Sequence, residues 1–192
     1  MHIPFTSLAV AAWLFFLAYW LWSARRLKQS ARAEPLLPRF FKYWLPIIVA
    51  IVLMWPTPWL DRTVLGHRLL PDTYAIALTG LLLIVAGVLF ACWARHILGS
   101  NWSSEVQLKQ GHELIERGPY RYVRHPIYTG ILLALLGTVV LLGEWRALLG
   151  FVIMFVSFWR KLRLEETWLG EYFGPAYADY KRRVKALIPG IL

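Results

Sequence analysis

The chain has 192 residues, the length of one domain, and 58% of them are hydrophobic before glycine is counted. Soluble domains contain roughly 45–50% apolar residues even with glycine included, so the composition excludes an ordinary soluble protein and predicts an integral membrane protein. The net charge is +10, but Lys and Arg lie between apolar segments. This placement indicates membrane topology and contact with anionic lipids, and it argues against nucleic-acid binding.

Five apolar segments predict an all-α fold with five transmembrane helices. In chain order they are residues 5–22, 43–60, 74–94, 127–142 and 147–159. The first three have the length of about 20 residues that a helix needs to cross the hydrocarbon core. Only four residues separate the last two, which predicts a helical hairpin. Its arms are short, but residues 160–164 can lengthen the second arm, and we expect both arms to cross.

Lys and Arg divide unequally between alternate connections. Segments 23–42, 95–126 and 160–192 hold six, five and seven of them, whereas the other connections hold three. Those three are Arg62, Arg68 and Arg146. Because cytoplasmic loops carry an excess of Lys and Arg, we expect the N-terminus outside and the C-terminus in the cytoplasm.

The chain beyond residue 164 predicts cytoplasmic helices. Residues 165–185 carry aromatic and acidic side chains at helical spacing, and the pair Gly174 and Pro175 predicts a break between two helices. We treat 1–192 as a single membrane domain. Residues 1–94 supply its first three transmembrane helices, and residues 95–192 supply the hairpin, the C-terminal helices and the candidate binding residues.

A motif before the fourth helix combines a turn with a helix start. Residues 118–130 read GPYRYVRHPIYTG. Gly118 and Pro119 predict a turn in which the backbone can approach a ligand closely. Pro126 suits the first position of the helix, and the residue before a proline avoids helical geometry, so we expect His125 just outside the helix.

Two arginines give this helix start an affinity for anions. Arg121 and Arg124 lie beside a helix N-terminus, where free N–H groups and the helix dipole favour negative charge. Arginine and tyrosine at a cytoplasmic helix start are also ordinary membrane anchors. The turn followed by Arg-His-Pro fits the anchor interpretation less well.

An acidic pair follows the fifth apolar segment. Glu165 and Glu166 either form a solvated face or bind a cationic ligand or a proton. In the first interpretation they pair with the nearby cations Lys161, Arg163 and Lys181. The arms of a hairpin pack together, so we expect Arg124 and His125 to lie beside the two glutamates. Such a cleft would suit a zwitterionic, cationic cofactor.

The two motifs resemble those of the isoprenylcysteine carboxyl methyltransferase family and the related phospholipid methyltransferases. The resemblance covers residues 112–189: HELIERGPYRYVRHPIYTG, then EETWLGEYFGPAYADYKRRV, then LIP. The first three helices match only in hydropathy. Members of the family are integral membrane enzymes that use S-adenosylmethionine and lack the soluble Rossmann-type domain. The chain likewise contains no G-x-G-x-x-G sequence.

The resemblance implies one cofactor pocket built from both motifs. The implied cofactor-binding residues are His112, Gly118, Pro119, Tyr120, Arg121, His125, Pro126, Tyr128, Glu165 and Glu166. The implied catalytic residues are Arg124, Arg163 and Glu166. A closing helix would carry Phe173, Gly174, Tyr177 and Tyr180. No metal is expected, because the histidines are too scattered and Cys92 is the single cysteine.

The methyl acceptor stays open between three chemistries. It is expected to be lipophilic and to enter from the bilayer, bearing a carboxylate, a thiol or a lipid headgroup. A carboxylate or thiolate needs a nearby cation, for which the arginines are candidates. An amine, as in a phospholipid N-methyltransferase, needs a base such as a glutamate with a raised pKa. Methyl transfer itself needs mainly positioning and a dry site.

Two non-enzymatic alternatives remain. One is a membrane protein that binds lipid or the cofactor without catalysis, against which the acidic pair argues. The other is a transporter, against which the lack of charged residues in the first four apolar segments argues. The sequence leaves the oligomeric state open.

Overall fold

The structure is a computed structural model, and it describes residues 3–26, 30–33, 40–55, 58–99, 107–109 and 114–192. Its α-helices are α1 (Ile3–Ser23), α3 (Leu45–Met54), α4 (Pro58–Asp61), α5 (Tyr74–Leu98), α6 (Pro126–Leu142), α7 (Trp145–Phe173) and α8 (Pro175–Arg183). A π-helical turn, η2 (Phe40–Trp44), precedes α3, and 3-10 turns are η1 (Ala24–Arg26), η3 (Val64–Gly66) and η5 (Gly118–Arg121). The expected helical architecture is confirmed. A short antiparallel pair, β1 (Ser30–Ala33) with β2 (Gln107–Lys109), was not expected.

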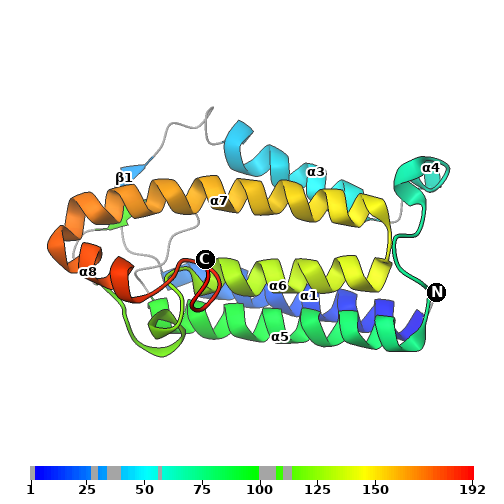
Figure 1. The fold of residues 1–192 in the computed structure, drawn as a ribbon, viewed down its shortest axis with the longest axis horizontal. Coiled ribbons are helices and arrows are strands. Elements are labelled where there is room, and N and C mark those ends of the chain that lie inside the picture. The colour runs from blue at the N-terminus through cyan, green and yellow to red at the C-terminus, as the bar shows by residue number, and fades with distance from the viewer. Residues whose placement is uncertain (1–2, 27–29, 34–39, 56–57, 100–106, 110–113) are drawn as a thin grey trace.

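The long helices lie side by side with two distinct ends (Figure 1). α5 packs along α6, α1 along α5, and α3 along α7. At one end α5 and α7 finish, α6 begins, and η5 and α8 gather; we call this the α8 end. At the other end lie α4 and the turn between α6 and α7; we call this the α4 end. The α6–α7 turn confirms the predicted hairpin.

The contact between α5 and α6 is built from glycine. Gly80 and Gly87 on α5 face Gly137 and Gly130 on α6. A Cβ atom added at Gly87 would lie 2.5 Å from the backbone nitrogen of Ala134, which no side chain can tolerate. Small residues allow helix backbones to approach this closely in membranes. The glycines therefore fix the position of α6, and with it the position of the motif that precedes α6.

The hydrophobic surface confirms the membrane character. Two helical segments, Pro4–Ser23 and Tyr74–Leu98, are long and apolar enough to cross a bilayer, whereas Phe40–Met54 and Pro126–Leu142 are shorter. Side chains such as Leu14 on α1 are more than half exposed although they are apolar. Water would disfavour such a surface, and lipid accommodates it. The number of crossings stays a prediction.

Two helix boundaries differ from the prediction. The second apolar segment is interrupted: α3 ends at Met54, Trp55 is extended with ψ 142°, and α4 begins at Pro58. Prolines at positions 56 and 58 account for this, because proline cannot continue a helix and its predecessor avoids helical geometry. By contrast α7 runs unbroken for 29 residues, so the fifth apolar segment and the first C-terminal helix are one rod of about 43 Å.

The predicted break after α7 is present. Gly174 has φ +55°, a conformation that favours glycine, and α8 begins at the next residue. The turn folds α8 back toward the start of α6 (Figure 1).

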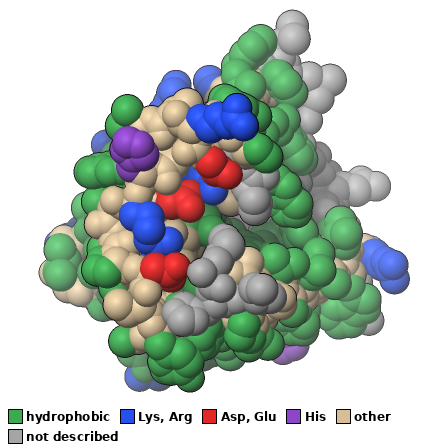
Figure 2. All heavy atoms as spheres, turned by 90° about the vertical axis from the view of Figure 1, so that its right-hand side faces the viewer, with side chains coloured by type: hydrophobic (Ala, Val, Ile, Leu, Met, Phe, Trp, Pro, Cys, Tyr) green, Lys and Arg blue, Asp and Glu red, His purple; other side chains and the backbone are tan. Residues whose placement is uncertain are grey.

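A buried arginine closes the α4 end. Arg146 is only 3% exposed. Its guanidinium pairs with Glu144, lies 3.2 Å from an oxygen of Asp61 and donates to the carbonyl of Trp55 at 2.9 Å. Figure 2 shows this end as a small group of acidic and basic side chains within a largely hydrophobic surface. The arginine ties the α6–α7 turn to the end of α3 and to α4.

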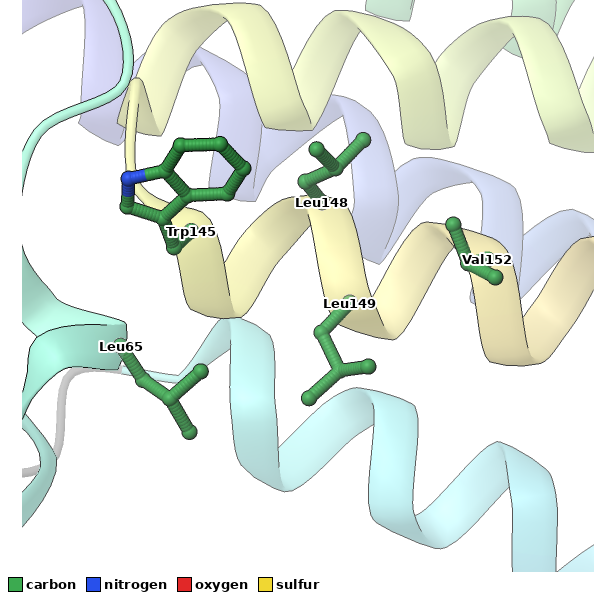
Figure 3. A pocket seen from close by; sticks show the side chains of 5 residues that line it. All are labelled: Leu65, Trp145, Leu148, Leu149 and Val152. Carbon is green, nitrogen blue, oxygen red and sulfur yellow. The ribbon is translucent and has the colours of Figure 1, made fainter.

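An apolar hollow of about 290 Å³ lies near the start of α7 (Figure 3). Its lining consists of Leu65, Trp145, Leu148, Leu149 and Val152. It is remote from the motif residues, which lie at the opposite end of the bundle.

Candidate functional site

The start of α6 has the predicted local geometry. Gly118 adopts φ +60° and opens the turn η5. Pro126 occupies the first turn of α6, and His125 precedes it with φ −121° and ψ 59°, outside helical geometry. The sequence therefore places His125 at a fixed angle to the helix axis, with its ring directed into the α8 end.

Several residues of the turn act as framework. Pro119 and Tyr120 are buried. The hydroxyl of Tyr120 donates to the carbonyl of Ala94 at 3.4 Å, and the backbone carbonyl of Tyr120 accepts the hydroxyl of Tyr180 at 2.6 Å. Tyr120 thus links α5 to α8. Arg121 is exposed, with its guanidinium 5.2 Å from the ring centre of Tyr122.

A C-terminal segment, residues 184–187, is hydrogen-bonded to the start of α6. The N–H groups of Arg124 and His125 donate to the carbonyls of Lys185 and Ala186 at 2.8 and 3.0 Å. The hydroxyl of Thr129 donates to the carbonyl of Leu187 at 2.8 Å. The backbone donors just before the helix are therefore engaged by the chain itself, whereas the expected anion site at the first turn of α6 stays a prediction.

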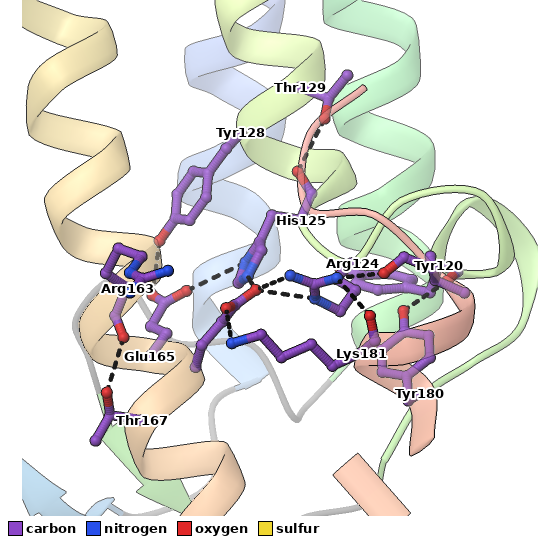
Figure 4. A network of polar contacts seen from close by, with 12 residues as sticks. Tyr120, Arg124, His125, Tyr128, Thr129, Arg163, Glu165, Thr167, Tyr180 and Lys181 are labelled. Atoms are coloured by element: carbon purple, nitrogen blue, oxygen red, sulfur yellow. Dashed lines mark hydrogen bonds and ion pairs between the residues drawn. The ribbon is translucent and has the colours of Figure 1, made fainter. Parts of the chain in front are cut away.

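The two motifs meet in a buried ion-pair network (Figure 4). Arg124 donates to Glu166 through Nε, at 2.9 Å, and through Nη2. Nε2 of His125 lies 3.3 Å from the same carboxylate oxygen, and Nζ of Lys181 lies 2.8 Å from the other. The Glu166 side chain is only 4% exposed. The predicted proximity of Arg124 to Glu166 is confirmed.

Hydrogen bonds decide the charge of Glu166. Burial alone would raise the pKa of this carboxyl, but hydrogen bonds from His125, Lys181 and Arg124 outweigh burial and hold the pKa well below its usual range. Glu166 is therefore ionised at neutral pH. A glutamate base with a raised pKa was the expectation for an amine acceptor, and Glu166 has the opposite property.

Glu165 occupies a more open and aromatic environment. Its side chain is 22% exposed, accepts the hydroxyl of Tyr128 at 2.6 Å and lies 3.6 Å from Nδ1 of His125. The ring of Tyr128 is stacked on His125 and on Phe158, with centroids 5.7 and 4.9 Å apart. Nζ of Lys161 lies 5.6 Å from the ring centre of Tyr128. Glu165 keeps accepting capacity for a further partner.

Two predicted residues, Arg163 and His112, are not part of the network as described. Arg163 is exposed on α7, and its hydrogen bond is made by its backbone carbonyl, which accepts Thr167 at 3.1 Å. His112 lies outside the described residues. Sequence reasoning named Lys181 only as a partner of a solvated acidic face, yet Lys181 contacts the buried carboxylate. Lys181 follows Tyr177, an expected residue of the closing helix, by four positions along α8, and residues at this spacing share a helix face. This spacing could have identified Lys181 from the sequence.

Comparison with known proteins relates this site to a family. The model of the isoprenylcysteine carboxyl methyltransferase family matches residues 79–171. Proteins named protein-S-isoprenylcysteine O-methyltransferase are 34% identical in Dictyostelium discoideum and 35% identical in Mus musculus. These alignments cover 62% and 60% of this chain, and 52% and 42% of the respective relatives. The chain thus spans about half the length of the curated relatives it matches.

A solved structure shares the fold. It is the structure of the eukaryotic intramembrane Ras methyltransferase ICMT, with a TM-score of 0.58 and 23% identity, covering 82% of this chain and 55% of that one. The family match includes the start of α6 and both glutamates, the elements that build the network described above. Residues 79–171, just under half of this chain, thus match the isoprenylcysteine carboxyl methyltransferase family, and the fold is similar to that of a solved member.

Proposed function

We propose that this protein transfers a methyl group from S-adenosylmethionine to a carboxylate of a lipophilic acceptor at the cytoplasmic membrane face. The observation that carries the proposal is the junction of Arg124 and His125 with Glu165 and Glu166 at the α8 end. The names of the relatives support an acceptor that is a carboxylate attached to a prenylated thioether.

The side chains at this junction fit the charges of the cofactor. S-adenosylmethionine supplies the methyl group from a sulfonium and also carries an ammonium and a carboxylate. Glu165, with 22% exposure and spare accepting capacity, suits the ammonium or a ribose hydroxyl. The stacked rings of Tyr128 and Phe158 suit a positive centre, because aromatic faces attract cations. Lys181, 47% exposed, suits the carboxylate.

Of the residues proposed as catalytic, two position other side chains and one binds the acceptor carboxylate. Arg124 and Glu166 neutralise each other, so we assign to both the positioning of His125 and Lys181. Arg163 is exposed on α7 and is the cation that we assign to the acceptor carboxylate. The protein's contribution to an in-line transfer is then orientation and exclusion of water.

The test is a methyl-transfer assay on the purified full chain in liposomes. Methyl-labelled S-adenosylmethionine is supplied with an S-farnesylated cysteine derivative that has a free carboxylate, or with the matched carboxamide. We expect a base-labile methyl ester from the carboxylate alone. Label in phospholipid amines would instead support a phospholipid N-methyltransferase. Cofactor binding without transfer to either acceptor or to a total lipid extract would support a non-catalytic binding protein.

The proposed orientation is testable by labelling single cysteines. In a Cys92→Ser background, Arg62→Cys at the α4 end should react with an impermeant reagent added outside, and Arg182→Cys on α8 should not. Both positions are exposed. Arg146 is unsuitable because it is buried. The reverse pattern would overturn the cytoplasmic assignment.

A further inference from the structure

Tyr177 has a buried hydroxyl whose proton meets no acceptor among the residues that the structure describes. The residue lies on α8 and is only 3% exposed. Its hydroxyl is inaccessible and donates to no described residue, whereas the hydroxyl of Tyr180, one helical turn later, donates to the carbonyl of Tyr120 at 2.6 Å. A buried polar group without a partner costs about 1–3 kcal/mol. Native structures rarely leave such a group unpaired, so its presence calls for a structural or functional explanation.

The described groups around Tyr177 accept no hydrogen bond from its proton. Its ring packs with Leu169 and Phe173, and among the charged groups near its hydroxyl are Glu166 and Arg124. Arginine has only donors, and the oxygens of Glu166 are already contacted by Arg124, His125 and Lys181. Burial, followed by the charge of Glu166, raises the pKa of Tyr177, so the phenol keeps its proton. The group is a donor in need of an acceptor.

We infer that Tyr177 is a ligand-binding residue whose hydroxyl donates a hydrogen bond to the carboxylate of the methyl donor. This inference rests on the proposed function and deepens it. A donor beside the guanidinium of Arg124, and one turn from Lys181, favours an anionic acceptor over a neutral one. The carboxylate is the anionic group of S-adenosylmethionine and of its demethylated product.

The connection between α7 and α8 runs through a single glycine. Gly174 joins α7 to α8 with φ +55°, and a Cβ added there would meet no atom within 4 Å. The joint is therefore unobstructed on that side. Because Tyr177 is only 3% exposed, access of a ligand to its hydroxyl requires α8 to move at this joint.

The test compares tyrosine-to-phenylalanine variants of the full chain in detergent. For Tyr177→Phe we expect the affinity for S-adenosylhomocysteine, measured by calorimetry, to fall roughly ten- to a hundredfold. The unfolding temperature without ligand should stay unchanged or rise, because an unpaired buried hydroxyl is removed. Tyr122→Phe is the matched control: its residue is 51% exposed, and neither quantity should change. Tyr180→Phe should lower the unfolding temperature.

A second ligand tests whether the carboxylate accepts the hydrogen bond from Tyr177. Decarboxylated S-adenosylhomocysteine should bind wild type and Tyr177→Phe equally, since it lacks the partner of the hydroxyl. Equal affinity of the two proteins for S-adenosylhomocysteine would overturn the inference, and so would a large fall in the unfolding temperature of Tyr177→Phe. An equal loss for both ligands would overturn the carboxylate assignment. Failure of wild type to bind either ligand would overturn the proposed function as well.

Discussion

Each end of the bundle contains an arginine whose side chain is at most 7% exposed and pairs with a carboxylate, and these two arginines are held differently. Arg146 at the α4 end pairs with Glu144, two positions away, and lies 3.2 Å from Asp61. Arg124 at the α8 end contacts Glu166, 42 positions away, and the carbonyl of Val184, 60 positions away. The first arrangement closes a turn. The second assembles three separate parts of the chain.

The chemical surroundings of the two arginines differ as well. The two carboxylates near Arg146 belong to Glu144, in the turn between α6 and α7, and to Asp61, at the end of α4. Around Glu166 there are a histidine, a lysine and an arginine, and His125 also approaches the adjacent Glu165. A buried ion pair by itself is weak evidence of function, because both ends have one. The additional donors and stacked rings distinguish the α8 end.

Removing the central carboxylate should have the largest effect. Glu166→Ala leaves Arg124, His125 and Lys181 without their shared partner, and breaking a buried pair costs about 3–5 kcal/mol. We expect a marked fall in the unfolding temperature and loss of methyl transfer. Arg146→Ala should also lower the unfolding temperature, but activity per folded molecule should be kept. Loss of activity in the folded Arg146→Ala protein would erase the distinction between the ends.

Acid should act on the α8 end through Glu166. Its folded-state pKa is depressed, so its contribution to stability is complete above the unfolded-state pKa of about 4.3 and is lost as the pH falls below that value. We expect the unfolding temperature of wild type to fall between about pH 5 and pH 3 more steeply than that of Glu166→Gln. Parallel curves would show that the carboxylate is not stabilised as described.

A smaller effect should follow from the loss of one hydroxyl. Tyr128→Phe keeps the stacked ring and removes the 2.6 Å hydrogen bond to Glu165. A hydrogen bond to a charged group contributes about 1.5–3 kcal/mol, and the partial exposure of Glu165 favours the lower value. We expect a raised KM for the methyl donor with little change in kcat. An unchanged KM would argue that Glu165 does not face the ligand.

The smallest effect should come from Lys181→Met. The lysine is 47% exposed, so solvent weakens its pair with Glu166, and we expect a loss of about 1 kcal/mol or less in chemical unfolding. A larger loss of unfolding free energy would show that the contact between Lys181 and Glu166 is as important for stability as a buried ion pair. Arg182→Met, at the neighbouring exposed position, is the control and should change nothing measurable.

The sequence was sufficient to predict which distant motifs meet. A short turn between two apolar segments implies antiparallel arms, and this places Arg124 near Glu166. The charge state of Glu166 could not be predicted, because it depends on how many donors reach one carboxylate, which is a matter of distances. Prolines at positions 56 and 58 indicated the interruption after Met54. The prediction instead followed the continuous hydropathy of residues 43–60.

Two other features had no side-chain signal. The segment 184–187 contacts the start of α6 partly through backbone carbonyls, which any residue provides. The unpaired hydroxyl of Tyr177 is likewise visible only once its neighbours are placed. Motif spacing predicts proximity, but it does not show which polar groups are left without partners.

The attachment of residues 184–187 to the start of α6 has a consequence for biogenesis. Thr129 and its acceptor Leu187 are 58 positions apart, so the ribosome must complete both arms of the hairpin before this junction can form. Insertion of the helices into the bilayer can therefore precede maturation of the site. A chain halted during synthesis after α7 would be anchored in the membrane yet would lack the clasp that orients Arg124 and His125.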